Sequence, residues 1–207
     1  MRNYYHMNVI YKNLGFLASH KGTDLQAIIS ACKSGTLQAT PTVIISNNSH
    51  SGAIIKAKRE RIPFYNLSAN THPIPEELDL AILNALVLNK VDLVILAGYD
   101  RKLGIQTLTH YDGRVINIHP SLLPKHGGAG MYGIRVHQAV LEAGETDTGI
   151  SIHLIDKDYD RGRIIAQTRV AVLPSDTAES LSMRVLEREH SFFVETIGKI
   201  LNGEISL

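Results

Sequence analysis

Asn117 and His119 could do chemistry together, because they stand at the end of a short apolar run that stops at Pro120. Residues 115–119 have the character of a buried strand, and proline ends a strand because it cannot donate a ladder hydrogen bond. Side chains alternate across a strand, so both are expected on one side, about 7 Å apart. The pair would place an amide donor beside a titratable imidazole. The alternative is a capping asparagine and a solvated histidine.

Three aspartates stand at alternate positions further along the chain: Asp156, Asp158 and Asp160. The spacing suggests a calcium loop, but Arg161 follows and the closing glutamate of an EF-hand is missing. We expect a carboxylate of this loop to contact an imidazole, raising its pKa and holding its orientation. A solvated acidic turn is the alternative.

The histidines could suggest a metal site, but their pattern does not support one. The candidates are His119, His126, His137 and His153. Neither H-E-x-x-H, nor paired thiolates, nor a regular ligand spacing is present. We therefore expect solvated or core histidines and no metal.

Residues 19–24 join an apolar run to an amphipathic helix and form a second candidate site. A helix amino terminus offers unpaired N–H groups and a positive dipole end, which suit a phosphate, and Lys21 adds a charge. The segment is neither G-x-G-x-x-G nor a Walker loop. The alternative is an ordinary turn with a threonine cap, since Thr23 and Gln26 have capping-box spacing.

A glycine-rich loop follows the proline-bounded strand at residues 125–133. Pro124 separates it from that strand, which disfavours a phosphate loop. We expect either a mobile cover over a site or a tight surface loop.

Apolar periodicity supplies the elements that must position these residues. Strands are expected at residues 14–18, 43–45, 64–66, 91–97, 115–119, 148–155 and 164–173, and helices at 25–33, 52–61, 75–88, 103–110, 134–143 and 176–201. The alternation of strands and helices predicts an α/β fold with a Rossmann-like open twisted sheet and helices on both faces. Its amino-terminal half should be parallel and its carboxyl-terminal half mixed. Residues 1–12 are expected to be an extension and residues 13–207 a single domain.

Composition excludes several function classes. The chain has 207 residues, of which 44% are hydrophobic, and a formal net charge of +1. That charge gives no support to nucleic-acid or membrane-surface binding. Cys32 is the single cysteine, so no disulfide framework is expected, and no long apolar run is present. We expect a cytoplasmic protein, monomer or homodimer, with small-molecule partners.

The order of these segments resembles the folate-dependent formyltransferase superfamily. The motif at residues 117–124, NIHPSLLP, is followed about forty residues later by Asp160-x-Gly162. The first turn, residues 17–28, resembles the glycinamide ribonucleotide formyltransferases within that superfamily. Further matches are residues 96–103, Thr148-Gly149 and residues 188–190. The resemblance covers roughly residues 13–201.

The resemblance implies transfer of a formyl group from 10-formyltetrahydrofolate to the glycine amine of glycinamide ribonucleotide. It implies Asn117, His119 and Asp160 as the catalytic trio. Attack of the amine on the formyl carbonyl gives a tetrahedral intermediate, to whose oxyanion Asn117 and a protonated His119 can donate. Asp160 would favour the imidazolium and position a water for proton transfer. Neither a metal nor a covalent nucleophile is required.

The resemblance also implies two groups of binding residues. The residues expected at the acceptor are Lys21, Gly22, Thr23, Asp24 and Glu189. The residues expected at the folate are Asp100, Arg101, Lys102, Leu103 and Asp156.

Several positions depart from the family pattern: His20 and Lys21 stand where glycine or another small residue is usual, and Arg61 stands where glycine is common. Asp24 stands where asparagine is usual, and a carboxylate beside a phosphate is repulsive. Either Lys21 compensates, Asp24 turns away as a helix cap, or the acceptor is not a phosphate ester. Asp100 stands where methionine is usual, and an unpaired charge beside an apolar pterin pocket would be costly. A different small amine acceptor, or an inactive folate-binding relative, are the alternative functions.

Overall fold

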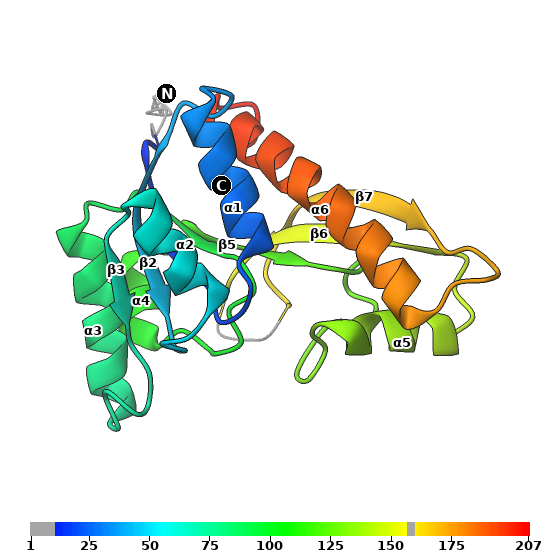
Figure 1. Cartoon of the computed structure of the whole chain (residues 1–207), viewed down its shortest axis with the longest axis horizontal. Helices are drawn as coiled ribbons and strands as arrows, with labels where there is room; N and C mark the ends of the chain where they lie inside the picture. The colour runs from blue at the N-terminus through cyan, green and yellow to red at the C-terminus, as the bar shows by residue number, and fades with distance from the viewer. Residues whose placement is uncertain (1–10, 157–159) are drawn as a thin grey trace, which may run out of the picture.

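The computed structural model describes residues 11–156 and 160–207, which form a seven-stranded sheet with helices on both faces (Figure 1). The strands are β1 (Asn13–Leu17), β2 (Thr40–Ser46), β3 (Phe64–Asn66), β4 (Leu93–Leu96), β5 (Val115–His119), β6 (Asp147–Leu154) and β7 (Ile164–Ala171). The helices are α1 (Thr23–Lys33), α2 (Gly52–Glu60), α3 (Pro75–Leu88), α4 (Ile105–His110), α5 (Ile134–Glu142) and α6 (Ala178–Leu201). Each expected strand and helix is present, with ends shifted by a few residues.

The sheet has the order β3-β2-β1-β4-β5-β6-β7. Neighbours from β3 to β5 are parallel, while β6 runs antiparallel to both β5 and β7. The predicted division into a parallel and a mixed half is therefore confirmed. The chain reverses its direction of winding between β1 and β4, and open α/β sheets bind ligands at such a switch point, beyond the carboxyl ends of the strands.

Two hydrophobic clusters cover the two faces of the sheet, and strand alternation divides the residues between them. In β1, Phe16 belongs to the cluster under α1 and α6, and Leu17 belongs to the cluster under α3. Ile95 and Leu96 of β4 divide in the same way. Figure 1 shows α1 and α6 together on one face. Helices on both faces are thus confirmed, and two buried layers hold the central strands in place.

The helix starts differ from prediction in one respect. Gly22, not Thr23, is the N-cap of α1; it has a left-handed backbone (φ 66°), and no side chain caps this helix. The predicted capping box of Thr23 and Gln26 is therefore wrong, because the Gln26 amide instead donates to Glu60 of α2. A capping box does form at the start of α6, where Thr177 and Ser180 bond reciprocally.

No helix in residues 11–156 or 160–207 is both long and apolar enough to cross a membrane.

Candidate active site

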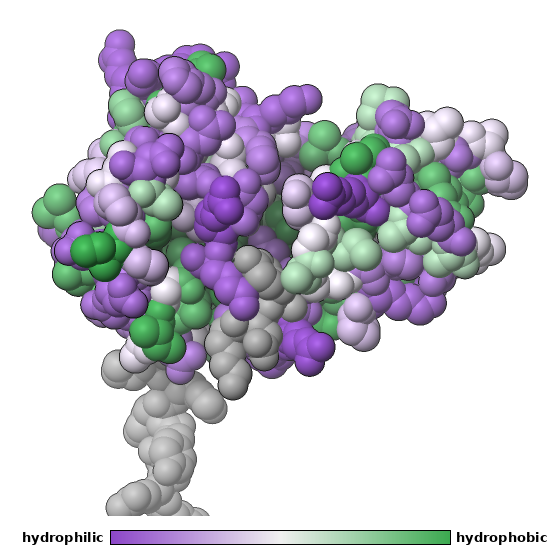
Figure 2. Space-filling view, turned by 90° about the horizontal axis from the view of Figure 1, so that it is seen from below, coloured by the Kyte–Doolittle hydropathy of each residue, from purple (hydrophilic) through white to green (hydrophobic). Residues whose placement is uncertain are grey.

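Asn117 and His119 lie on the same side of β5, as strand alternation predicts, and line one cavity of about 460 Å³. The cavity opens beyond the carboxyl ends of β1, β4 and β5, where the winding reverses. Figure 2 shows the surface hollowed between the part of the molecule that carries α3 and the part that carries α5. His119 is 4% exposed, so its imidazole is almost removed from bulk solvent.

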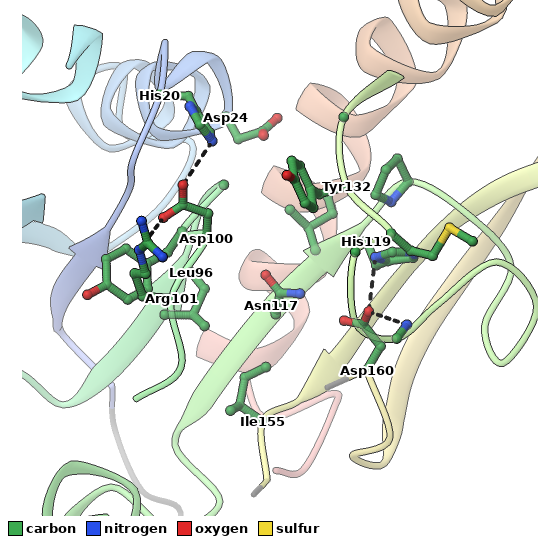
Figure 3. Close-up of a pocket in the computed structure, with 18 of the residues that line it drawn as sticks. His20, Asp24, Leu96, Asp100, Arg101, Asn117, His119, Tyr132, Ile155 and Asp160 are labelled. Atoms are coloured by element: carbon green, nitrogen blue, oxygen red, sulfur yellow. Dashed lines mark hydrogen bonds and ion pairs between the residues drawn. The ribbon is translucent and has the colours of Figure 1, made fainter. Parts of the chain in front are cut away.

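Both ring nitrogens of His119 face a partner, and Figure 3 shows the one formed by Asp160. Its Nε2 donates to the backbone carbonyl of His126 at 2.9 Å, and its Nδ1 lies 3.6 Å from Oδ2 of Asp160. Burial lowers the pKa of His119, while the Asp160 carboxylate acts in the opposite direction and raises it. The expected effect of Asp160 is present, but burial is stronger, so a neutral imidazole is favoured around neutral pH.

Asp160 is held in place from several sides. The Gly128 amide donates to its Oδ2 at 2.9 Å, and its Oδ1 lies 3.5 Å from Nε2 of His153. Burial opposes ionisation of this carboxyl, but the nearby imidazole of His153, the charge of His119 and the Gly128 amide together lower its pKa. Asp160 therefore stays a carboxylate between two imidazoles.

His153 is a site residue that the sequence analysis considered only as a possible metal ligand. It is fully buried, and the register of β5 and β6 puts it directly opposite Asn117. Its Nδ1 donates to the Leu154 carbonyl at 2.9 Å, so its Nε2 can accept from the Asn117 amide at 3.1 Å. The polar face of β6, with His153 two residues after Ser151, was the signal that could have found it.

The acceptor residues expected from the resemblance divide into two groups. Asp24 and Glu189 line the cavity, whereas Lys21, Gly22 and Thr23 do not. Lys21 is exposed, and its carbonyl accepts from Lys56. Lys21 therefore does not offset the negative charge of Asp24. Asp24 does not act as a helix cap either, because Gly22 is the N-cap of α1.

Asp24 and Glu189 form an acidic corner of the cavity, close to His190. Oδ1 of Asp24 lies 3.6 Å from Nε2 of His190, too far for a hydrogen bond. Burial raises the pKa of Asp24, while the charge of His190 and the backbone of Asp24 itself act to lower it. Burial first, and then the charge of Asp24, raise the pKa of Glu189 well above its usual value.

The expected folate residues all line the cavity. The carboxylate of Asp100, which could have been unpaired beside the pterin pocket, has hydrogen-bond partners. Its Oδ1 accepts from the Ser19 hydroxyl at 2.8 Å and from the Asn47 amide at 2.9 Å. His20 and Arg101 face its two oxygens at 3.7 and 3.6 Å (Figure 3). Asp100 thereby ties the turn after β1 to the segment after β4. The other four expected folate residues that line the cavity are Arg101, Lys102, Leu103 and Asp156.

The glycine-rich loop contributes residues 128–133 to the cavity lining. Its Tyr132 is 54% exposed, so part of the cavity wall is open to solvent. The position of the glycine-rich loop at the cavity favours a cover over a site rather than a tight surface loop.

Asp158 of the acidic segment lies in residues 157–159, outside the described residues. In the part of the chain that the structure describes, His, Cys, Asp and Glu side chains form no group of three suited to a metal ion.

The chain belongs to the formyl transferase family, whose pattern matches residues 12–197. It is 35% identical over 195 residues to the chloroplastic phosphoribosylglycinamide formyltransferase of Arabidopsis thaliana, with 94% of this chain and 67% of that protein covered. It is 32% identical to the phosphoribosylglycinamide formyltransferase of Escherichia coli K12, with 94% and 90% covered. The chain spans about two thirds of the length of the plant relatives.

Solved structures agree with this assignment. The crystal structure of phosphoribosylglycinamide formyltransferase from Bacillus halodurans superimposes with a TM-score of 0.86 at 33% identity, covering 93% of this chain and 97% of that one. The Rossmann-like fold expected from the sequence is thus confirmed.

Proposed function

We propose that the chain is a phosphoribosylglycinamide formyltransferase of purine biosynthesis, which moves a formyl group from 10-formyltetrahydrofolate to the glycine amine of glycinamide ribonucleotide. The observation that carries the proposal is the meeting of Asn117, His119 and Asp160 at one cavity of a formyl transferase chain. The relatives' names support the same acceptor. A cytoplasmic location, a single domain and a monomeric or homodimeric state stay predictions.

In the proposed reaction the amine attacks the formyl carbon, a new C–N bond forms, and the bond to the folate nitrogen breaks. One amide hydrogen of Asn117 is directed to His153, which leaves the second for the developing oxyanion. His119 is the second donor. Its Nε2 hydrogen is bonded to the His126 carbonyl, so the formyl oxygen must compete with that carbonyl.

A proton must also move from the attacking amine to the departing folate nitrogen. Asp160 is a carboxylate beside His119, so it can accept a hydrogen bond from a water and favour the imidazolium when it forms. Burial lowers the pKa of His119, which makes its imidazolium a stronger acid than an exposed one. Asn117 and His119 would therefore stabilise charge, and Asp160 would guide the proton.

Asp100 gives a physical link between the two proposed substrate regions. Ser19 and His20 belong to the acceptor turn, and Arg101 belongs to the folate segment, yet all three contact or face Asp100. The two walls of the cavity are thus set at a fixed separation. Correct separation is what a direct transfer between two bound substrates requires.

Single-turnover transfer tests the proposal. The purified chain is mixed with 10-formyltetrahydrofolate and glycinamide ribonucleotide, and formylated ribonucleotide is measured by mass spectrometry. We expect product with the wild type and at least roughly 10²-fold slower formation with Asn117→Ala. Absence of formylated product from the wild type would contradict the proposal.

A different small amine acceptor is the second candidate, favoured by the carboxyl group of Asp24 in the acceptor corner. Comparison of glycinamide ribonucleotide with its dephosphorylated form separates the two. A preference for the phosphorylated acceptor supports the first proposal, and a preference for the dephosphorylated form supports the second.

A further inference from the structure

Two acidic side chains from distant parts of the chain share the acceptor corner of the cavity. Asp24 comes from the first turn of α1, and Glu189 comes from the middle of α6, which packs beside α1. Both line the cavity. Glu189 is 7% exposed, and burial first, and then the charge of Asp24, raise its pKa.

These two carboxyl groups have few of the donors that normally hold buried carboxylates: the backbone of Asp24 acts on its own carboxyl group, but one oxygen of that group stays unpaired. Oδ1 of Asp24 is buried without a hydrogen-bond partner, and so is Nε2 of His190, a basic side chain 3.6 Å away. Among the described residues no hydrogen bond reaches the carboxyl group of Glu189. By contrast, Asp160 and Asp100 each accept at least one short hydrogen bond.

Three of the other basic side chains around the cavity face carboxylates other than Asp24 and Glu189. In the turn before α1, His20 is exposed and faces Asp100, as does Arg101 from the segment after β4. From β5, His119 is committed to Asp160 and His126. His137 on α5 and Lys102 complete the basic side chains of the lining. A carboxyl group with an unpaired buried oxygen, beside a second buried carboxyl group, favours the uptake of a proton.

We propose that the carboxyl groups of Asp24 and Glu189 hold one proton between them and present it to an anionic group of the amine acceptor. This inference rests on the proposed function, since it concerns how that acceptor is held. A protonated carboxyl group is a hydrogen-bond donor with the shape of an amide. Asp24 would thus act on the phosphate of the acceptor as asparagine would, and the repulsion expected from a carboxylate is removed.

The raised pKa values of both groups agree with a shared proton. Loss of the proton at high pH would restore a carboxylate beside the acceptor phosphate and weaken binding. Above pH 7 the phosphate remains dianionic, so its own titration does not contribute. The amine of the acceptor titrates in this range, but equally for every variant.

Infrared difference spectroscopy tests the shared proton directly. We expect the wild-type protein at pH 7 to show the carbonyl band of a protonated carboxyl group that is lost or shifted in both Asp24→Asn and Glu189→Gln. Glu145→Gln is the matched control, because Lys125 and other partners lower the pKa of Glu145 and keep it ionised. That variant should leave the band in place.

Calorimetric binding of glycinamide ribonucleotide gives the functional readout. We expect the ratio of wild-type to Asp24→Asn affinity to fall between pH 7 and pH 9, by at most tenfold per pH unit because one proton is involved. A wild-type spectrum without a band that both substitutions perturb overturns the inference, and so does a constant affinity ratio. A wild type that forms no formylated product speaks against the proposed function, whereas the infrared result decides the shared proton by itself.

Discussion

The Nε2 atom of His119 is bonded to the backbone carbonyl of His126, at 2.9 Å. His126 has a left-handed backbone (φ 53°) and stands at the start of the glycine-rich loop, whose residues 128–133 line the cavity. The imidazole of the proposed reaction is therefore tied to the segment above the cavity. In the neutral ring the single proton lies on Nε2, so Nδ1 faces Asp160 without a proton until the ring is charged.

Replacing His119 should slow transfer without unfolding the chain. His119→Ala removes one of two proposed oxyanion donors, and we expect the rate of single-turnover transfer to fall by at least roughly 10²-fold. Far-UV circular dichroism should stay that of the wild type. His72→Ala, in the exposed loop after β3, is the control and should keep the wild-type rate. A His119→Ala rate near that of the wild type would remove the proposed mechanism.

Asp160→Asn should lower the rate at least roughly 10²-fold and also change its pH dependence. The reaction as proposed uses protonated His119, so the rate falls as pH rises through the pKa of this group. The Asp160 carboxylate acts to raise that pKa, against burial. Its removal should move the high-pH limb of kcat/KM to lower pH. Asp147→Asn, at the exposed start of β6, should keep the wild-type limb, and an unmoved limb in Asp160→Asn would exclude the electrostatic role.

His153→Ala should reduce kcat about tenfold, by an indirect route. The Asn117 amide would lose its acceptor at 3.1 Å, and Asp160 would lose the imidazole at 3.5 Å, so both would be less well oriented. Leaving such buried groups unpaired costs about 1–3 kcal/mol of unfolding free energy. Steady-state kinetics and urea unfolding measure the two effects. Unchanged kcat together with lowered stability would make His153 a structural residue only.

Local patterns in the sequence were sufficient to predict the strands and helices and the pairing of Asn117 with His119 on one side of β5. Apolar runs gave β1, β4 and β5, and alternation within β5 put Asn117 beside His119. A glycine in the left-handed conformation explains why the predicted threonine cap at the start of α1 is wrong. Gly22 can adopt φ 66° without the clash that other residues meet, and the backbone then turns into the helix without a side-chain cap.

The remaining parts of the site depend on which strands become neighbours. His153 meets Asn117 only through the antiparallel register of β5 and β6. Asp100 accepts hydrogen bonds from Ser19 and Asn47 because β1 lies between β2 and β4, and local periodicity does not predict this strand order. A contact between a carboxylate of the acidic loop and an imidazole was expected from the sequence, but the choice of Asp160 and His119 came from the family resemblance.

Acid should weaken the start of α6 through Asp176. Its carboxylate accepts two hydrogen bonds from Arg184, at 2.6 and 2.7 Å, and one from the Leu173 amide at 2.8 Å. The guanidinium of Arg184 is the main cause that lowers the pKa of Asp176. A lowered pKa stabilises the fold above the unfolded value of about 3.9, and this contribution disappears as pH falls towards the folded value.

Asp176→Asn should therefore lower the urea midpoint at pH 7, and the difference from the wild type should shrink as pH falls below about 4. Asp112→Asn, in the exposed turn after α4, is the control and should leave the midpoint unchanged. A difference between wild type and Asp176→Asn that does not depend on pH would show that shape, rather than charge, matters at this position.

Gly162→Ala should disturb the proposed site indirectly, by displacing the backbone next to Asp160. A Cβ at this position would overlap the backbone oxygen of Leu154, so the chain must shift where β6 and β7 are connected. Gly162 stands two residues after Asp160, whose carboxylate lies 3.6 Å from His119. We expect kcat to fall by roughly 10²-fold, since small displacements of positioned groups have effects of this size.

The control for Gly162→Ala is Gly198→Ala in α6, where an added Cβ meets only the Leu37 side chain at 3.5 Å. That variant should keep kcat, and its helix should gain up to about 1 kcal/mol from the better propensity of alanine. Wild-type kcat in Gly162→Ala would mean that the chain can shift at Gly162 without moving Asp160. In that case the backbone after Asp160 would not set the distance between Asp160 and His119, and the anchoring would come from the Gly128 amide and His153.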